Sequence, residues 1–115
     1  MNLDAAAAVI VARLNDGGVR ATVDERDINP PAVWVKPPEL SFRFGKGWSA
    51  NWTLTACVPD TGRDVALGKL GHLVADVQAA MNWAVVTALP VSLIVPGGSA
   101  PLPAYELTFS ERIQP

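Results

Sequence analysis

The hydrophobic positions near the start of the chain follow the spacing of a helix. One apolar stripe recurs on a single helical face: Leu3, Ala7, Ile10 and Leu14. Alanines fill most of the positions between them and have the highest intrinsic helix propensity. Asn2 or Asp4 can cap the first turn, and Gly17-Gly18 supplies the left-handed residue that commonly ends a helix. The pattern predicts a first helix over residues 3–16.

Short apolar segments separated by prolines follow this helix. Val19–Val23 is predicted to be a short strand, and Asp24–Pro31 is a charged loop that ends in two prolines. Ala32–Lys36 is the next strand, and Pro37-Pro38 follows it directly. Because proline cannot donate a hydrogen bond to a strand ladder, this strand is expected to be short and near a sheet edge.

The centre of the chain has the clearest alternation of apolar and polar residues. The first alternating run covers residues 40–44, and Gly45-Lys46-Gly47 separates it from a second run over residues 48–58. Two such runs joined by a glycine-containing turn predict a β-hairpin with one apolar and one polar face. The polar row is long and uncharged: Ser49, Asn51, Thr53, Thr55 and Cys57.

The spacing becomes helical again from Asp64 to about Trp83. The apolar stripe of this second helix is Ala66, Leu70, Leu73, Val74, Val77 and Met81. Gly68 and Gly71 each weaken a helix by roughly 1 kcal/mol relative to alanine. Such glycines can let another backbone approach closely.

The remainder of the chain is predicted to be β-structure. Ala84–Leu89 and Val91–Val95 are apolar and flank a kink or bulge at Pro90, and Pro96–Pro103 is a loop. A last strand alternates over residues 105–110. The fold class is therefore α+β, a single domain over residues 1–115, with two helices packed on one face of a mostly antiparallel sheet. The order of the main elements is α-β-β-β-α-β-β.

Composition narrows the functional classes. The chain has 115 residues, 50% of them hydrophobic, and a net charge of -2. Its basic residues are scattered singly among acidic ones, whereas a nucleic-acid-binding protein usually has a basic stripe. The apolar stretch Trp83–Val95 contains Pro90 and is too short to span a bilayer, and no signal peptide is recognised. We expect a soluble, intracellular protein without specific nucleic-acid or membrane partners.

Candidate chemistry is sparse. His72 is the only histidine and Cys57 the only cysteine, so no paired-ligand spacing for zinc exists. His72 lies in the middle of the predicted helix, and no cationic residue adjoins Cys57 to activate its thiol. The acidic residues Asp24, Glu25 and Asp27 share one loop without the spacing of a calcium-binding loop. We expect no catalytic site, no metal and no cofactor.

The surfaces are more informative than the single reactive residues. Trp34 alternates to the side opposite Val33 and Val35, beside Lys36, and tryptophans often anchor protein interfaces. Loops on a rigid scaffold also favour partner contacts. The candidate interface residues are Trp34, Lys36, Asp24, Glu25, Asp27, Arg43, Asn51 and Thr53.

The order of these elements resembles that of the tail terminator, or tail completion, proteins of long-tailed bacteriophages, especially those that infect actinobacteria. The likeness lies in the helix that ends at Gly-Gly, the segment Asn29-Pro30-Pro31-Ala32-Val33-Trp34-Val35 that leads to Pro37-Pro38, the hairpin, the helix and the closing hairpin. The Asn-Pro-Pro-Ala segment is the most specific part of the likeness, which in detail covers the first third of the chain. The remainder matches in order and length.

The resemblance implies a structural virion protein. Such a protein forms a ring, expected to be a hexamer, that caps the tail tube, ends tube polymerisation and offers a surface to the head–tail connector. Its partners would be itself, the tail tube protein and the connector, at the head-proximal end of the tail after assembly in the host cytoplasm. The alternatives are another head–tail joining protein, such as a stopper or adaptor, or a small protein- or peptide-binding module.

Overall fold

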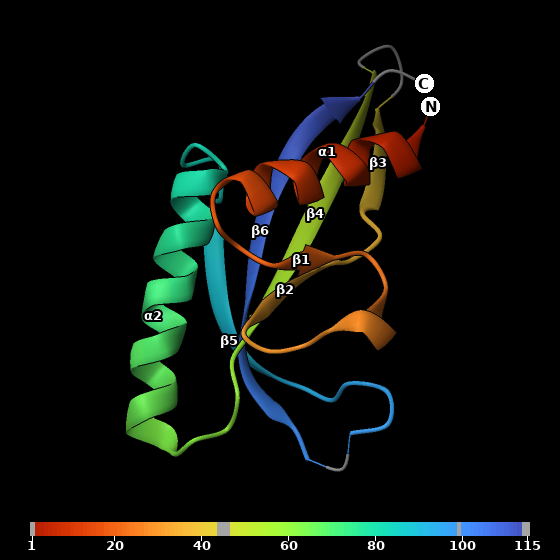
Figure 1. Ribbon diagram of the computed structural model, residues 1–115. Coiled ribbons are helices and arrows are strands. Elements are labelled where there is room, and N and C mark those ends of the chain that lie inside the picture. The colour runs from red at the N-terminus through yellow and green to blue at the C-terminus, as the bar shows by residue number, and fades with distance from the viewer. Residues whose placement is uncertain (1, 44–46, 99, 114–115) are drawn as a thin grey trace.

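The computed structural model describes residues 2–43, 47–98 and 100–113. Two α-helices, one short 3-10 helix and six strands occupy these residues (Figure 1). In chain order they are α1 (Leu3–Asp16), β1 (Ala21–Thr22), η1 (Glu25–Asp27), β2 (Ala32–Val35), β3 (Glu39–Arg43), β4 (Gly47–Cys57), α2 (Arg63–Ala80), β5 (Thr87–Leu93) and β6 (Leu102–Ile113). The predicted α+β class is confirmed. Four strands precede α2 where the predicted order counts three, and the two-residue β1 lies within the short strand predicted at Val19–Val23.

The six strands form one sheet in the order β1-β2-β4-β6-β5, and β3 also pairs with β4. β4 and β6 are the longest strands and run antiparallel, from Trp48 opposite Ile113 to Cys57 opposite Ala104. β2 and β3 share the other edge of β4, one along each half of its length. Only the β1–β2 pair is parallel, so the sheet is mostly antiparallel, as predicted.

Both helices lie on the same face of this sheet, as the apolar stripes require. α1 crosses in front of β6 and β4 with β1 and β2 below it, and α2 contacts α1, β6 and β4 (Figure 1). The side chain of Asn2 caps α1 by accepting a hydrogen bond from the backbone N–H of Ala5 at 2.9 Å. Gly17 ends the helix, and Gly18 adopts a positive φ of 82°. These are the capping residues that the sequence indicates.

The helices approach each other most closely where α1 ends. A Cβ atom added to Gly17 would lie 2.7 Å from the Cβ of Ala80, which is too close for two carbon atoms. In contrast, no described atom lies within 4 Å of a Cβ added to Gly68 or Gly71. Within the chain, the close approach expected at those two glycines therefore occurs at Gly17 instead.

The main core lies between the sheet and the helices. Trp52 is its largest fully buried side chain, and its indole N–H donates to a carboxylate oxygen of Glu111 at 2.8 Å. Ile10 and Leu14 of α1 and Val77 of α2 belong to the same cluster.

A second, smaller core covers one end of the opposite face. Its buried members are Ile28, Ala32, Cys57 and Ala104, and side chains from β5 and the β5–β6 connection pack against them. The sequence pattern places both helices on the other face and predicts no segment that covers this one. Instead, the loop after η1 and the β5–β6 connection cover one end of it, because both segments carry apolar side chains that are buried against the sheet at this end.

Two element boundaries differ from prediction. α2 ends at Ala80 rather than near Trp83, and the next strand begins at Thr87 rather than Ala84. Pro90 stands within the single strand β5, where an edge position tolerates it. The predicted turn at Gly45-Lys46-Gly47 includes residues that lie outside the described ones.

Candidate functional site: the open face of the sheet

The predicted polar row lies on the sheet face opposite the helices. Trp52, Leu54 and Ala56 of β4 point into the main core, so the residues that alternate with them point the other way. β6 pairs with β4 so that Ser110 lies opposite Asn51 and Thr108 opposite Thr53. The open face is defined by the following residues: Trp34, Lys36, Ser41, Asn51, Thr53, Thr55, Thr87, Leu89, Glu106, Thr108 and Ser110.

The polar side chains of the open face bond to one another across the strands. Asn51 donates from Nδ2 to the hydroxyl of Ser41 at 3.0 Å and accepts at Oδ1 from the hydroxyl of Ser110 at 2.6 Å. The hydroxyls of Thr87 and Thr108 are also hydrogen-bonded to each other. These bonds link β3, β4, β6 and β5 in rows, so much of the hydrogen-bonding capacity of this face is satisfied within it.

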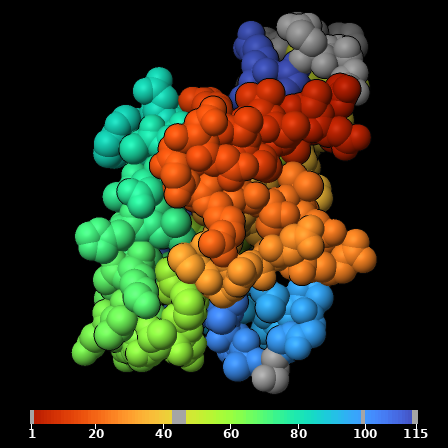
Figure 2. All heavy atoms as spheres, viewed as in Figure 1, coloured from red at the N-terminus to blue at the C-terminus, as the bar shows by residue number. Residues whose placement is uncertain are grey.

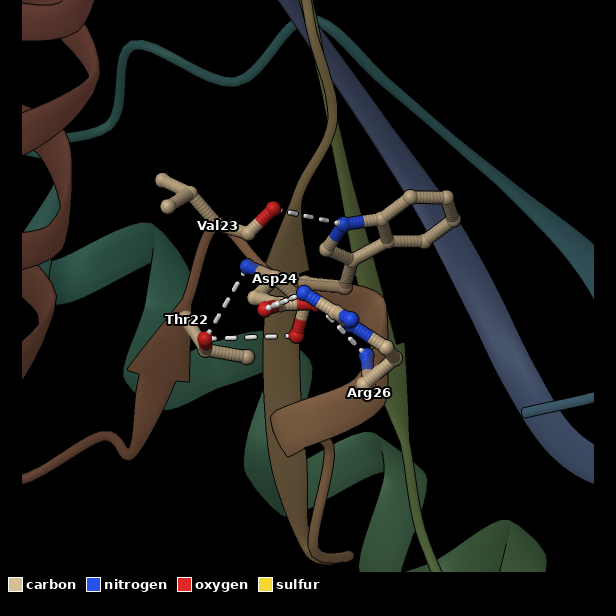
Figure 3. Close-up of polar contacts among 5 residues, drawn as sticks. Thr22, Val23, Asp24 and Arg26 are labelled. Carbon is tan, nitrogen blue, oxygen red and sulfur yellow. Dashed lines mark hydrogen bonds and ion pairs between the residues drawn. The ribbon is translucent and has the colours of Figure 1, made fainter. Parts of the chain in front are cut away.

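An ion pair and an indole ring occupy the middle of the face. Lys36 Nζ lies 3.0 Å from Glu106 Oε1, with both side chains about one-third exposed, and 5.2 Å from the centroid of the Trp34 ring. The indole N–H of Trp34 donates to the backbone carbonyl of Val23 at 3.3 Å (Figure 3). Trp34 lies on the predicted face but is half-buried and bonded within the chain.

A hollow of about 520 Å³ crosses the open face beyond this pair. Thr53 and Thr108 contribute to its floor, and Pro37 and Val86 lie at its sides. A neighbouring protein could therefore make contact with small hydroxyl and amide groups here.

One polar atom of the face has no partner among the described residues. The hydroxyl of Thr55 is buried, and its residue stands between Trp34 and Glu106 in the register. A buried hydroxyl without a hydrogen bond lowers stability by about 1–3 kcal/mol. This residue is one that sequence patterns cannot single out, because it looks like its neighbours.

Replacing Thr55 by valine is therefore expected to raise the free energy of unfolding by about 1 kcal/mol, since valine fills the same space without a polar atom. Chemical denaturation measures this change. Thr53→Val is the matched control, because Thr53 is only partly buried, and its effect should stay within about 0.5 kcal/mol. A loss of stability in Thr55→Val would show that the hydroxyl has a partner.

The acidic loop forms a small local structure beside Trp34. Asp24 caps η1, accepting from the backbone N–H of Arg26 at 3.0 Å and pairing with its guanidinium at 3.1 and 3.0 Å (Figure 3). The side-chain hydrogen bond from Arg26 lowers the pKa of the Asp24 carboxyl. Glu25 and Asp27 are exposed. Arg43 ends β3, and its side chain lies outside the described residues.

Cys57 and His72, the two residues with reactive side chains, occupy different surroundings. Cys57 is fully buried in the second core, where its thiol approaches the carbonyl of Ala32 at 3.6 Å, and burial raises its pKa. His72 is exposed on α2. Among residues 2–43, 47–98 and 100–113, no group of three or more histidine, cysteine or acidic residues is placed to hold a metal ion.

An apolar groove on the helix side of the sheet was not predicted. It has a volume of about 790 Å³ and lies between α1 and the β1 edge (Figure 2 shows α1 across the front, above the β1–η1 segment). We call it the α1–β1 groove, and its walls include Ala7, Ala8, Val11, Val23, Val35 and Trp52. Periodicity could not reveal it, because the groove depends on how far α1 stands from the sheet edge.

Comparisons with known proteins add no relative. No model of a protein family matches the chain, and a search of curated proteins finds no match. No described helix is both long and apolar enough to cross a bilayer.

Proposed function

We propose that the protein is a structural component of a bacteriophage tail, of the tail terminator type. In this role it forms a ring, a hexamer by the resemblance, that caps the tail tube and ends its polymerisation. The ring then offers a surface for the head–tail connector. The protein would be located at the head-proximal end of the tail, after assembly in the host cytoplasm. It works by contact alone, without catalysis or a cofactor.

The observation that carries this proposal is the internally bonded open face. A polar group that is buried without a partner costs about 1–3 kcal/mol, which usually opposes protein association. Asn51, Ser110 and the Thr87–Thr108 pair already have partners within the face. A tube or connector protein can cover them without leaving their groups unsatisfied. The face is thus suited both to water and to a protein neighbour.

Thr53→Arg is the direct test of this surface. It places a long charged side chain in the hollow of the open face, and we expect it to abolish capping while the fold is retained. The measurement is the length distribution of tail tubes polymerised with and without the protein, together with the mass of the protein in solution.

Thr61→Arg is the control, since Thr61 is exposed in the turn before α2 and should cap as the unmodified protein does. Normal capping by Thr53→Arg would contradict the role of the open face. A protein that stays monomeric and also fails to bind tube ends would overturn the terminator proposal. Binding to the connector without binding to tubes would favour the stopper or adaptor alternative.

The α1–β1 groove favours a second candidate, a small peptide-binding module. Its volume of about 790 Å³ lies within the range of pockets that enclose a ligand, and its walls are mostly apolar. A module of this kind would bind peptides as a monomer and would not change tube length. The same two measurements therefore separate it from the first proposal.

A further inference from the structure

The connection between α2 and β5 holds a tryptophan out into solvent. Asn82 and Trp83 both adopt positive φ angles, 55° and 61°. A left-handed conformation is unfavourable for a bulky side chain such as that of Trp83. Even so, Trp83 is 72% exposed. Strained backbone that displays an apolar side chain points to a use for that side chain.

Hydrogen bonds fix this connection. The amide of Gln78 donates to the carbonyl of Val85 at 3.0 Å and accepts from its N–H at 3.1 Å. The backbone N–H of Trp83 donates to the carbonyl of Gln78 at 2.8 Å. Val85 itself is buried in the main core. Trp83 is therefore held in position on both sides, which lowers the entropy lost when it binds.

Further apolar side chains lie along the adjoining edge. Val86 is 78% exposed and Leu89 is 60% exposed, and we call these two residues with Trp83 the β5-edge patch. No charged residue stands between Asp76 and Glu106 in the sequence. Sheet edges are usually protected by charged side chains, and an exposed apolar edge marks a contact site.

The α1–β1 groove lies at the opposite side of the molecule. β1 and β5 are the two ends of the strand order, and Figure 1 shows α1 and β1 to the right of the α2–β5 connection. Each copy of the chain thus has an uncharged apolar projection on one edge and, near the other, a groove whose walls are mostly apolar and also include Asp4 and Lys36. The groove, at about 790 Å³, has room for an indole ring and an aliphatic side chain.

We infer that the β5-edge patch of one copy docks in the α1–β1 groove of the next copy. The inference rests on the proposed function, because it names the surfaces by which the ring would form. The two surfaces differ, so the contact is head-to-tail and leaves a free patch and a free groove at the ends of every open chain. Such a contact forms a ring where the rotation between successive copies closes, as the proposed function requires. Leu89 belongs to the open face as well, so the contact covers the β5 margin of that face, and the part around Asn51 and Ser110 remains available for tube and connector proteins.

Two single substitutions test the contact from its two sides. Trp83→Asn removes the projection and suits a positive φ, so its thermal unfolding should occur at the same temperature or higher. Ala8→Lys places a charged chain in the groove at an exposed helical position. In sedimentation velocity over a concentration series, the unmodified protein should assemble, whereas each variant should remain a 12.2 kDa monomer.

Mixing the two variants gives the decisive result. Trp83→Asn keeps an intact groove and Ala8→Lys keeps an intact patch, so an equimolar mixture should form a dimer and stop there. A patch-to-patch contact would let Ala8→Lys associate alone, and a groove-to-groove contact would let Trp83→Asn associate alone. Either result would overturn the inference. Leu67→Asn is the control, because Leu67 is an exposed apolar residue of α2 outside both surfaces, and it should assemble normally.

The outcomes also separate this inference from the proposed function. Assembly of both variants like the unmodified protein would overturn the contact and leave the terminator proposal standing. A mixed dimer, together with unmodified protein that does not shorten tubes, would support the contact and count against the terminator role. Unmodified protein that stays monomeric at every concentration overturns the contact, and its behaviour at tube ends then decides the proposed function alone.

Discussion

Replacing Trp52 by alanine should lower the free energy of unfolding by about 3–5 kcal/mol, the largest effect expected of a single substitution in this chain. Trp52 is 1% exposed at the centre of the main core, so alanine would leave a cavity between the sheet and α1. The hydrogen bond from its indole N–H to Glu111 would also be lost. A loss of this size is a large share of the stability of a small domain.

Urea denaturation followed by circular dichroism measures this change, and Trp52→Phe separates its two causes. Phenylalanine keeps most of the buried apolar surface but cannot donate to Glu111, so its cost should be well below that of alanine. Trp83→Asn is the control for losing a tryptophan as such, because Trp83 is exposed, and it should not lower stability. A change below about 1 kcal/mol for Trp52→Ala would contradict the burial described here.

Gly17→Ala should destabilise the protein by about 1–3 kcal/mol, because overpacking a close contact forces the backbone or its neighbours to move. The added methyl group would meet the Cβ of Ala80 at 2.7 Å. Gly17 has a φ of −83°, which alanine adopts without strain, so the effect isolates the helix–helix contact. The measurement is again the free energy of unfolding.

The double substitution Gly17→Ala with Ala80→Gly supplies the internal check. Removing the Ala80 methyl group opens the space that the new one needs, so the pair should couple favourably beyond the sum of the single effects. Gly71→Ala is the control for an added methyl group that has free space. Its Cβ would meet no described atom within 4 Å, so the substitution should stabilise α2 by up to about 1 kcal/mol. Additive single effects at positions 17 and 80 would show that the two helices do not press on each other there.

The sequence predicts those parts of the fold that periodicity governs. The stripes of α1 and α2 and the alternation in β4 identify the core face, and the same alternation places Trp34, Asn51 and Thr53 together on the other face. Neighbouring positions along one element are related by local geometry, which a pattern of residue types reflects.

Features that depend on contacts between distant segments could not be predicted. The pattern extends α2 to Trp83, but the helix ends at Ala80, and Gln78 then bonds the backbone of Val85. Trp34 is half-buried because its indole bonds to Val23 and because it packs, as Val91 does, against the second core. Such cover depends on tertiary packing and leaves no local signal.

The second core also gives the molecule a direction along its strands. One end of the open face is covered by the loop after η1 and the β5–β6 connection, whereas the other end, around Asn51 and Ser110, is exposed to solvent. Copies joined side by side through a head-to-tail contact would all point the same way. A ring of this kind, with its strands running from rim to rim, would have two chemically different rims. In the proposed role, one rim would meet the tail tube and the other would meet a different partner, the connector.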